Sequence, residues 1–558
     1  MQRRTFLKAV AGSSVITTLD WLRWFRSFGV PGSSKELGIA TAAAQAATEP
    51  HYLVYWFQEG GWDGYSMFNP LDTRNDATLV IPAGTLNPNP SWSDQLYRPS
   101  GYGTAPNDPP KTRGNVTYGF LAADGMASLA NDLAVVSSHH GNEFHSGGRW
   151  DYHYGKYNHS LSAKRGDDER TVMQAFCEAY GASTLLPHVS WHRWLSDGEL
   201  SLANYPEGTG YYEKLGPPYA HTLYGKLPED MRNRLRQIQG LTANARDARI
   251  RSFVDDLHRN FVADRNSESV KAFASAVQIH QSLVGGSVTV DPNAMFTDSA
   301  LRAEFAIQPA DETTSAAVVN GNPARSKESP NTNVQAMMAY ELMTKGLSIG
   351  FWIESRDVRG FDTHFPRRGV FQYSNPRGQQ NQLGRMKKDL WGPLLAFVAR
   401  LKSTPHPVTG KSYWDHTTIV LASEMGRMMG ADASSILQSA ATDADKYSQI
   451  MDQDVCQHWL VSSVAFLGGT VLGNRQWGRV GTVTQDAIPL MPDGTLDPAF
   501  DPVTGLMRSG AAQSPNSFVS DCGHVYATAL YLSGLDPDGL RSQGKGRNTS
   551  PAMRFIKR

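Results

Sequence analysis

The sequence is poor in cysteine, with only Cys177, Cys456 and Cys522 among 558 residues. Three cysteines allow at most one internal disulfide and leave one thiol over. No two of them have the Cys-x-x-Cys spacing, which excludes a zinc ribbon and a thioredoxin-type redox site. An oxidising compartment would permit a disulfide, but we expect buried free thiols.

The sequence also lacks an excess of charge of either sign, because 53 Lys and Arg residues balance 53 Asp and Glu residues. With a formal net charge of zero, no overall field attracts the protein to nucleic acid or to an anionic membrane surface. We therefore expect no nucleic-acid partner, and any preference for an anionic ligand has to arise locally. Long apolar runs are missing as well. After the N-terminal region no run approaches the ~20 residues of a membrane span, so we expect no stable span in the mature chain.

A pair of arginines, Arg3 and Arg4, stands at the start of the sequence, and a mildly apolar run covers residues 9–19. Charged residues interrupt this run soon afterwards, so it is too short for a membrane span and is typical of the apolar region of a signal peptide. Small residues just before position 48 form an A-x-A-like cleavage site. We expect residues 1–47 to be a twin-arginine signal peptide, read by the twin-arginine translocation machinery. The mature chain, residues 48–558, is then periplasmic or secreted.

Short apolar runs rich in β-branched and aromatic residues alternate with segments of helical periodicity. The runs have the composition of buried strands and cover residues 53–57, 133–136, 347–353, 417–422 and 459–467. Apolar residues at three- and four-residue steps predict helices at residues 171–180, 334–347 and 383–401. The alternation predicts an α/β fold built in layers. Pro393 lies inside the last helical pattern and predicts a kink or a restart there.

Three segments interrupt this alternation. Residues 69–115 are rich in Pro, Gly, Asn and Asp and have little periodicity, which predicts a long surface excursion. Residues from about 221 to 310 contain a helical pattern, and we interpret them as a helical insertion. Residues 310–332 are polar and contain proline, as is typical of a linker back to the core.

Polar residues suited to chemistry gather at the ends of the predicted strands. Four of the five strands are followed by such a cluster, and the fifth is preceded by one. In open α/β sheets, ligands bind outside the carboxyl ends of the strands, where residues distant in sequence converge. We therefore expect the functional site at this edge of the sheet.

A glycine-rich turn follows the first predicted strand. Gly60 and Gly61 permit a tight backbone, and Asp63 offers a carboxylate close behind them. Asp beside Gly often forms only a turn, so the pattern leaves a functional site and a plain turn equally open.

A histidine-rich segment follows the second predicted strand. Residues 139–159 hold five of the 16 histidines. Neutral imidazoles bind zinc and similar ions, and a serine beside them is a candidate nucleophile, so we favour His145 and Ser146. The alternative is a polar loop whose histidines only form hydrogen bonds.

An Asp-Thr-His motif follows the third predicted strand. Asp362 and His364 are two residues apart, so in an extended segment both side chains point to the same side and can share one ion. The position of the motif after a strand makes it the best candidate for a metal site.

The fourth and fifth predicted strands are flanked by Glu424, Arg427 and His458. Glu424 can ligate a metal, and the planar fork of Arg427 can bind an oxygen of phosphate or sulfate. His458 precedes the fifth strand, where its imidazole can complete a ligand set. The alternatives are an ordinary surface ion pair and a capping or core histidine.

Taken together, these motifs resemble a family of exported bacterial proteins known as domain of unknown function 1501, which belongs with the alkaline phosphatases and sulfatases. The matching pieces are spread over the mature chain. They are Gly-Gly-x-Asp-Gly at residues 60–64, His-Ser-x-Gly at 145–148, Phe-Asp-Thr-His at 361–364 and Ser-Glu-x-Gly-Arg at 423–427. A late histidine before an apolar Gly-Gly strand, at 458–469, and the closing helix, at 523–535, complete the set.

The resemblance implies a three-layer αβα sandwich with a large, mostly parallel sheet of the alkaline phosphatase type. It implies one or two divalent ions, of zinc, calcium, magnesium or manganese, held on loops at the strand ends. Carried over residue by residue, the implied ligands are Asp63, Asp362, His364, Glu424 and His458.

The resemblance also implies that Arg427 binds the oxyanion and that Ser146, beside His145, is the nucleophile. Ser138 and Thr363 also lie near candidate ligands in the sequence. Where the superfamily often has an Asp-His pair, this chain has Ser423 and Glu424, which leaves the second metal open.

The function that these motifs favour is an exported metal-dependent hydrolase of phosphate or sulfate esters, with a small-molecule or polymeric anionic substrate. The alternative is a non-catalytic exported binding or surface-assembly protein that keeps the fold, because the aromatic-rich segment at residues 188–194 can stack on sugars or pack against a partner. A third interpretation is a serine hydrolase that uses Ser146 with a histidine base and no metal, although no G-x-S-x-G motif is present.

Overall fold

The computed structural model describes a seven-stranded sheet with helices on both faces, and it leaves the predicted signal peptide outside the described residues. The described ranges are 49–58, 60–62, 67–70, 111–142, 145–155, 171–181, 184, 186–191, 228–229, 231–233, 235–236, 291–312, 330–354, 386–427, 458–484, 486–542 and 550–558. None of the helices in these ranges is long and apolar enough to cross a membrane.

The sheet is mostly parallel, and β10 is the strand that runs against the rest. Across the sheet the order is β11 (Arg475–Trp477), β4 (Ala134–His140), β10 (Val461–Gly468), β7 (Thr417–Ser423), β1 (Tyr52–Gln58), β6 (Gly350–Glu354) and β5 (His188–Ser190). β1 lies between two parallel neighbours, with Val54 opposite Phe351 of β6 and Ile419 of β7. Central parallel strands covered on both faces carry continuous apolar runs, which explains why the run at β1 was visible in the sequence.

Side chains alternate along the strands between two hydrophobic cores, one on each face of the sheet. On β1, Trp56 belongs to the first core, whereas Tyr55 and Phe57 belong to the second. Tyr55 stacks on Trp352 of β6 with a centroid distance of 4.9 Å and an interplanar angle of 6°. The sheet therefore forms the middle layer of the molecule.

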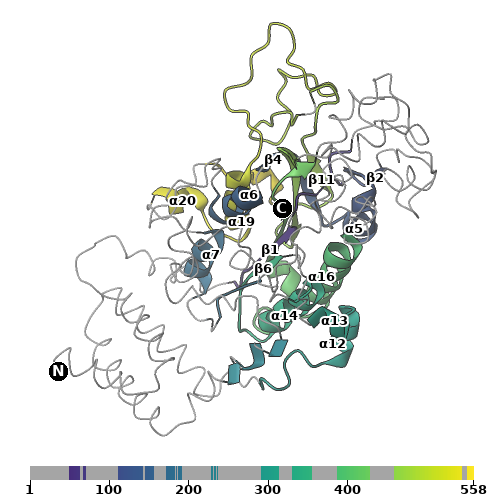
Figure 1. Cartoon of the computed structure of the whole chain (residues 1–558). Helices are drawn as coiled ribbons and strands as arrows, with labels where there is room; N and C mark the ends of the chain where they lie inside the picture. Colours follow the sequence, from purple (N-terminus) through teal and green to yellow (C-terminus); the bar gives the residue numbers. More distant parts are fainter. Residues whose placement is uncertain are drawn as a thin grey trace, which may run out of the picture.

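Helices cover both faces, as Figure 1 shows. The first core lies under α5 (Ala123–Leu129), α14 (Thr332–Thr344) and α16 (Gly392–Ser403). The second lies under α6 (His145–Tyr154), α7 (Val172–Tyr180) and α19 (Cys522–Leu532). The predicted α/β class with a large, mostly parallel sheet and layered helices is confirmed.

The remaining elements are short. They are β2 (Lys111–Arg113), β3 (Val116–Tyr118), η2 (Phe120–Ala122), α12 (Ser299–Glu304), α13 (Pro309–Glu312), η3 (Met386–Trp391), η4 (Tyr413–His416), β8 (Gly426–Arg427), β9 (His458–Trp459), α20 (Pro537–Ser542) and η6 (Arg554–Ile556). β2 and β3 form an antiparallel hairpin at the end of the predicted excursion, most of which lies outside the described residues.

Two local predictions can be checked directly. The helical pattern around Pro393 is split into the π-helix η3 and the α-helix α16, with Pro393 in the first turn of α16, so the predicted restart is confirmed. Cys177 and Cys522 are buried free thiols, also as predicted, and Cys456 lies outside the described residues.

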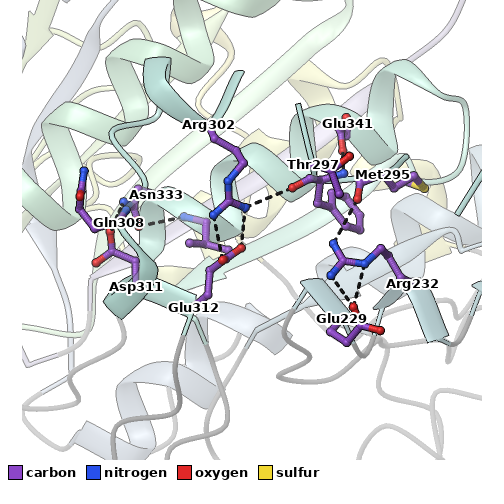
Figure 2. Close-up of polar contacts among 12 residues, drawn as sticks. Glu229, Arg232, Met295, Thr297, Arg302, Gln308, Asp311, Glu312, Asn333 and Glu341 are labelled. Carbon is purple, nitrogen blue, oxygen red and sulfur yellow. Dashed lines mark hydrogen bonds and ion pairs between the residues drawn. The ribbon is translucent and has the colours of Figure 1, made fainter. Parts of the chain in front are cut away.

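An ion-pair and hydrogen-bond network attaches α12 and α13 to α14 (Figure 2). Arg302 donates to both carboxylate oxygens of Glu312, at 2.7 and 2.8 Å. Asp311 accepts from the Asn333 side chain and the Gln308 N–H, and despite its burial these bonds keep the pKa of its carboxyl below the usual value. On α14, Glu341 accepts from a backbone N–H, but burial raises the pKa of its carboxyl.

A long segment, residues 479–517, connects β11 to α19, and we call it the arm; its described residues, 479–484 and 486–517, contain no helix. Figure 1 shows it projecting from the sheet at the top of the view. Asp501 accepts backbone N–H bonds from Val503 and Thr504 at 3.0 and 2.7 Å, which fixes one of its turns. Leu506 and Met507 nevertheless expose about half of their surface. The arm therefore presents apolar surface to solvent.

Candidate functional site

The edge at which the parallel strands end brings together most of the predicted polar clusters, and we call it the carboxyl edge. Gln58, at the end of β1, lies opposite Ser423, at the end of β7. β10 runs in the opposite direction, so it begins where its neighbours end, with Val461 opposite His140 of β4. A cluster that precedes β10 therefore lies at the same edge as clusters that follow the other strands.

The turn after β1 is attached to the end of β7 by three hydrogen bonds. Gly60 N–H donates to Oε1 of Glu424 at 2.7 Å, and Trp62 N–H donates to Oγ of Ser423 at 3.1 Å. Ser423 Oγ in turn donates to the carbonyl of Gln58 at 2.6 Å. Gly60 and Gly61 have φ angles of +103° and +75°, which side chains disfavour. The chain therefore leaves β1 in a fixed direction, and Asp63, the next residue after Trp62, lies outside the described residues.

Asn142, just before α6, and Gly148, in the first half of α6, both lie against Glu424. Asn142 N–H donates to the Glu424 carbonyl at 2.7 Å. A Cβ placed on Gly148 would lie 2.5 Å from the Glu424 Cβ, so only glycine allows this approach. His145 and Ser146 occupy the first turn of the same helix, and their side chains are outside the described part of the structure.

The backbones of Arg427 and His458 are paired at the same edge. β8 and β9 form an antiparallel pair in which Arg427 lies opposite His458. Neither side chain is described. Glu424 precedes β8 by two residues, so β8 begins and the antiparallel β9 ends close to Glu424, with Trp459 opposite Gly426.

A hydrogen-bond chain connects α6 to β4 and to the start of α19. His139, at the end of β4, lies 3.0 Å from Ser520 through Nδ1 and 2.6 Å from the Tyr152 hydroxyl through Nε2. The side chain of Asn142 also donates to Asp151 on α6 at 2.8 Å. Burial lowers the pKa of His139 to about 3, so its imidazole is neutral at ordinary pH.

A second buried polar group lies at the end of β6. Glu354 accepts from the indole N–H of Trp352 at 3.2 Å, and His153 of α6 stacks on the same indole at a centroid distance of 3.7 Å. The side chain of Gln335 on α14 bonds both backbone groups of Glu354, at 2.7 and 2.9 Å. The sequence analysis did not select Glu354 or His153 as site residues. A carboxylate at the end of an otherwise apolar strand was the available signal.

The structure therefore brings together the segments of four predicted motifs around Glu424, which is fully buried. Among the eight predicted site residues, Glu424 is the one whose side chain is described. Asp63, Asp362 and His364 lie outside the described residues. Within the described part of the chain, no group of three or more His, Cys, Asp or Glu residues is arranged to hold a metal ion.

The aromatic-rich segment at residues 188–194 is buried where it is described. His188 lies in β5 with 2% of its surface exposed, and Trp191 is fully buried. Burial lowers the pKa of His188 to about 3. These two side chains therefore belong to the core and do not form a stacking surface for sugars.

Comparison with known proteins gives no match, whether with protein-family models, curated proteins or solved structures. The geometry of the carboxyl edge and the sequence motifs are the basis on which a function is argued.

Proposed function

We propose that this chain is an exported metal-dependent hydrolase of phosphate or sulfate esters, of the domain of unknown function 1501 type with an alkaline phosphatase-like fold. The observation that carries the proposal is the meeting of four sequence-distant motif segments at Glu424, on the carboxyl edge of a mostly parallel sheet. This is the position at which α/β enzymes bind their ligands. The export signal rests on the paired arginines, Arg3 and Arg4.

The chemistry of Glu424 fits a divalent cation. Its side chain is fully buried, and a buried carboxylate requires hydrogen-bond donors or a cation to offset its lost hydration. Gly60 N–H supplies one donor to Oε1. Carboxylate and imidazole groups suit zinc, and carboxylates suit magnesium, calcium and manganese. The residues that would hold the ion are Asp63, Asp362, His364, Glu424 and His458.

The remaining candidates have roles in the transfer itself. A divalent ion would lower the pKa of the nucleophile and neutralise charge that develops on the transferred group. Ser146, in the first turn of α6, is the proposed nucleophile, with His145 beside it to take its proton. The guanidinium of Arg427 would bind two oxygens of the phosphoryl or sulfuryl group.

The test is elemental analysis of the folded protein together with Glu424→Gln. We expect at least one divalent ion per wild-type chain. In the variant, the affinity for zinc or magnesium should fall about tenfold or more. Glu341→Gln is the matched control, because Glu341 is also a buried carboxylate that accepts a backbone N–H. Its metal affinity should remain that of the wild type. A wild-type protein that binds no divalent ion and hydrolyses neither an aryl phosphate nor an aryl sulfate contradicts the proposal.

A second candidate function is a non-catalytic exported binding or surface-assembly protein, and the arm favours it. Val503, Leu506 and Met507 expose 55%, 50% and 48% of their surface, although each is apolar. Under this alternative, Leu506→Ser with Met507→Ser should abolish self-association measured by light scattering, whereas Glu424→Gln should have no effect. Turnover of an aryl ester that is lost in Glu424→Gln argues against it.

A further inference from the structure

The hydrogen bonds around His139 determine which of its ring nitrogens carries the proton. The hydroxyl of Ser520 donates its one hydrogen to the carbonyl of Ser138 at 2.9 Å. Ser520 Oγ therefore has to accept from Nδ1–H of His139, at 3.0 Å. Nε2 is then without a hydrogen and accepts from the Tyr152 hydroxyl at 2.6 Å. This set of hydrogen bonds requires a neutral imidazole in a single tautomer.

The hydrogen-bond chain through His139 holds the C-terminal half of α6, while the N-terminal half of α6 contacts the candidate site. Tyr152 is in the last turn of α6, and its ring is fully buried against Phe57 with a centroid distance of 5.5 Å. Gly148, one turn earlier, lies against Glu424. Since a helix of ten residues moves as a rigid rod, a shift at Tyr152 is transmitted to Ser146.

We propose that His139 and Tyr152 are positioning residues that hold α6, and with it Ser146, against Glu424, and that they do so only while His139 is neutral. The importance of Ser146 rests on the proposed function. The attachment of α6 through His139 does not, because it follows from the described hydrogen bonds.

A protonated imidazole cannot replace the neutral one without reorienting the Tyr152 hydroxyl. His139⁺ would direct N–H groups at both partners, and Tyr152 would have to turn its hydrogen away. The charged and titratable groups facing the pair are Asp521, which favours protonation of His139, His140 and His524, which oppose it, and Glu424, Cys522 and Tyr55 around Tyr152. Burial outweighs Asp521 and keeps the pKa of His139 far below that of an exposed histidine.

The pH dependence of α6 opening follows from this difference. When α6 separates from β4, His139 meets water and recovers a pKa near 6.5. Below that pH the open state binds a proton that the closed state does not bind. Opening is therefore favoured about tenfold per pH unit between pH 6.5 and pH 4.

Hydrogen exchange measured by mass spectrometry on peptides covering residues 145–154 tests the proposal. Tyr152→Phe removes one hydroxyl and keeps the buried ring, and we expect exchange in these peptides to rise about tenfold, corrected for intrinsic rates. Tyr180→Phe on α7 is the matched control and should leave them unchanged. Ser520→Ala, which removes the acceptor for Nδ1–H, is a second variant with the same expected effect.

His139→Gln separates positioning from titration. The glutamine amide oxygen lies near the position of Nε2 and can accept from Tyr152, but it does not titrate. We expect near wild-type protection at pH 7 and a pH dependence between 6.5 and 5 that is tenfold weaker per pH unit than in the wild type. His153 is present in both proteins, so the difference between them reports on His139.

Two results would overturn the proposal. One is equal exchange in Tyr152→Phe and Tyr180→Phe, and the other is a wild-type pH dependence in His139→Gln. Turnover of p-nitrophenyl phosphate is measured in parallel, and kcat should fall in Tyr152→Phe with KM unchanged. Absence of turnover of both this ester and p-nitrophenyl sulfate in the wild type counts against the proposed hydrolase alone, because the exchange measurements still decide whether His139 and Tyr152 hold α6.

Discussion

Ser423→Ala should destabilise the protein far more than the loss of one hydroxyl group usually does. Ser423 Oγ is buried and takes part in two hydrogen bonds, from Trp62 N–H and to the Gln58 carbonyl. Its removal leaves a buried N–H without a partner, which costs about 1–3 kcal/mol, and weakens the bonding of a carbonyl, which costs about 1 kcal/mol more. We therefore expect the free energy of unfolding to fall by about 2–4 kcal/mol.

Ser463→Ala is the matched control, because Ser463 is an equally buried serine on the adjacent strand β10. Its Oγ has no hydrogen-bond partner among the described residues. Removing it relieves the cost of burying a polar atom, so the unfolding free energy should stay within about 1 kcal/mol of the wild type or rise. Urea denaturation followed by tryptophan fluorescence measures both variants. If the two substitutions have equal effects, the hydrogen bonds at Ser423 do not fix the turn after β1, and the reasoning is refuted.

Two further predictions concern a close contact and the pH dependence of stability. Gly148→Ala should lower the unfolding free energy by about 1–3 kcal/mol, because its Cβ would lie 2.5 Å from that of Glu424. Gly410→Ala is the control, since its Cβ meets no atom within 4 Å and the substitution costs only the ~1 kcal/mol of its φ of +70°. Equal losses of unfolding free energy in urea denaturation contradict the contact. Burial lowers the pKa values of His139 and His188 to about 3, so the contribution of each neutral histidine to the unfolding free energy is fully present above pH 6.5. As the pH falls toward 3, each contribution decreases by up to about 1.4 kcal/mol per pH unit. His188→Gln should reduce the slope of unfolding free energy against pH, and an unchanged slope excludes a contribution from His188.

The central strands could be predicted from the sequence because each is buried on both faces. The apolar runs at residues 53–57 and 417–422 correspond to β1 and β7, whose residues are all buried. β5 and β11 have only three residues each, too few for a periodicity to appear, and β11 is partly exposed. Short strands at the margins of a sheet are specified by the neighbour they pair with, and this information is not local in sequence.

The candidate site was predictable as a location but less so as a set of contacts. The polar residues after β1 and β7 indicated the carboxyl edge, and the hydrogen bond from Gly60 to Glu424 places both motifs there. Sequence reasoning could not foresee that Glu424 would bond a backbone N–H. The hydrogen bonds of His139 could not be predicted either, because its partners Tyr152 and Ser520 are 13 and 381 residues away in the sequence.

The antiparallel direction of β10 explains why the fifth polar cluster precedes its strand. In a purely parallel sheet, a residue just before a strand lies at the amino edge, far from the carboxyl ends of its neighbours. β10 pairs antiparallel with both β4 and β7, so His458 is carried to the edge that holds Glu424. The described frame around Glu424 includes contacts from the main chain of other segments, namely Gly60 N–H, Asn142 N–H and the Gly148 backbone. Such a frame is complete once the sheet and α6 have formed, so a metal ion bound there would meet a preformed carboxylate and would not have to order it.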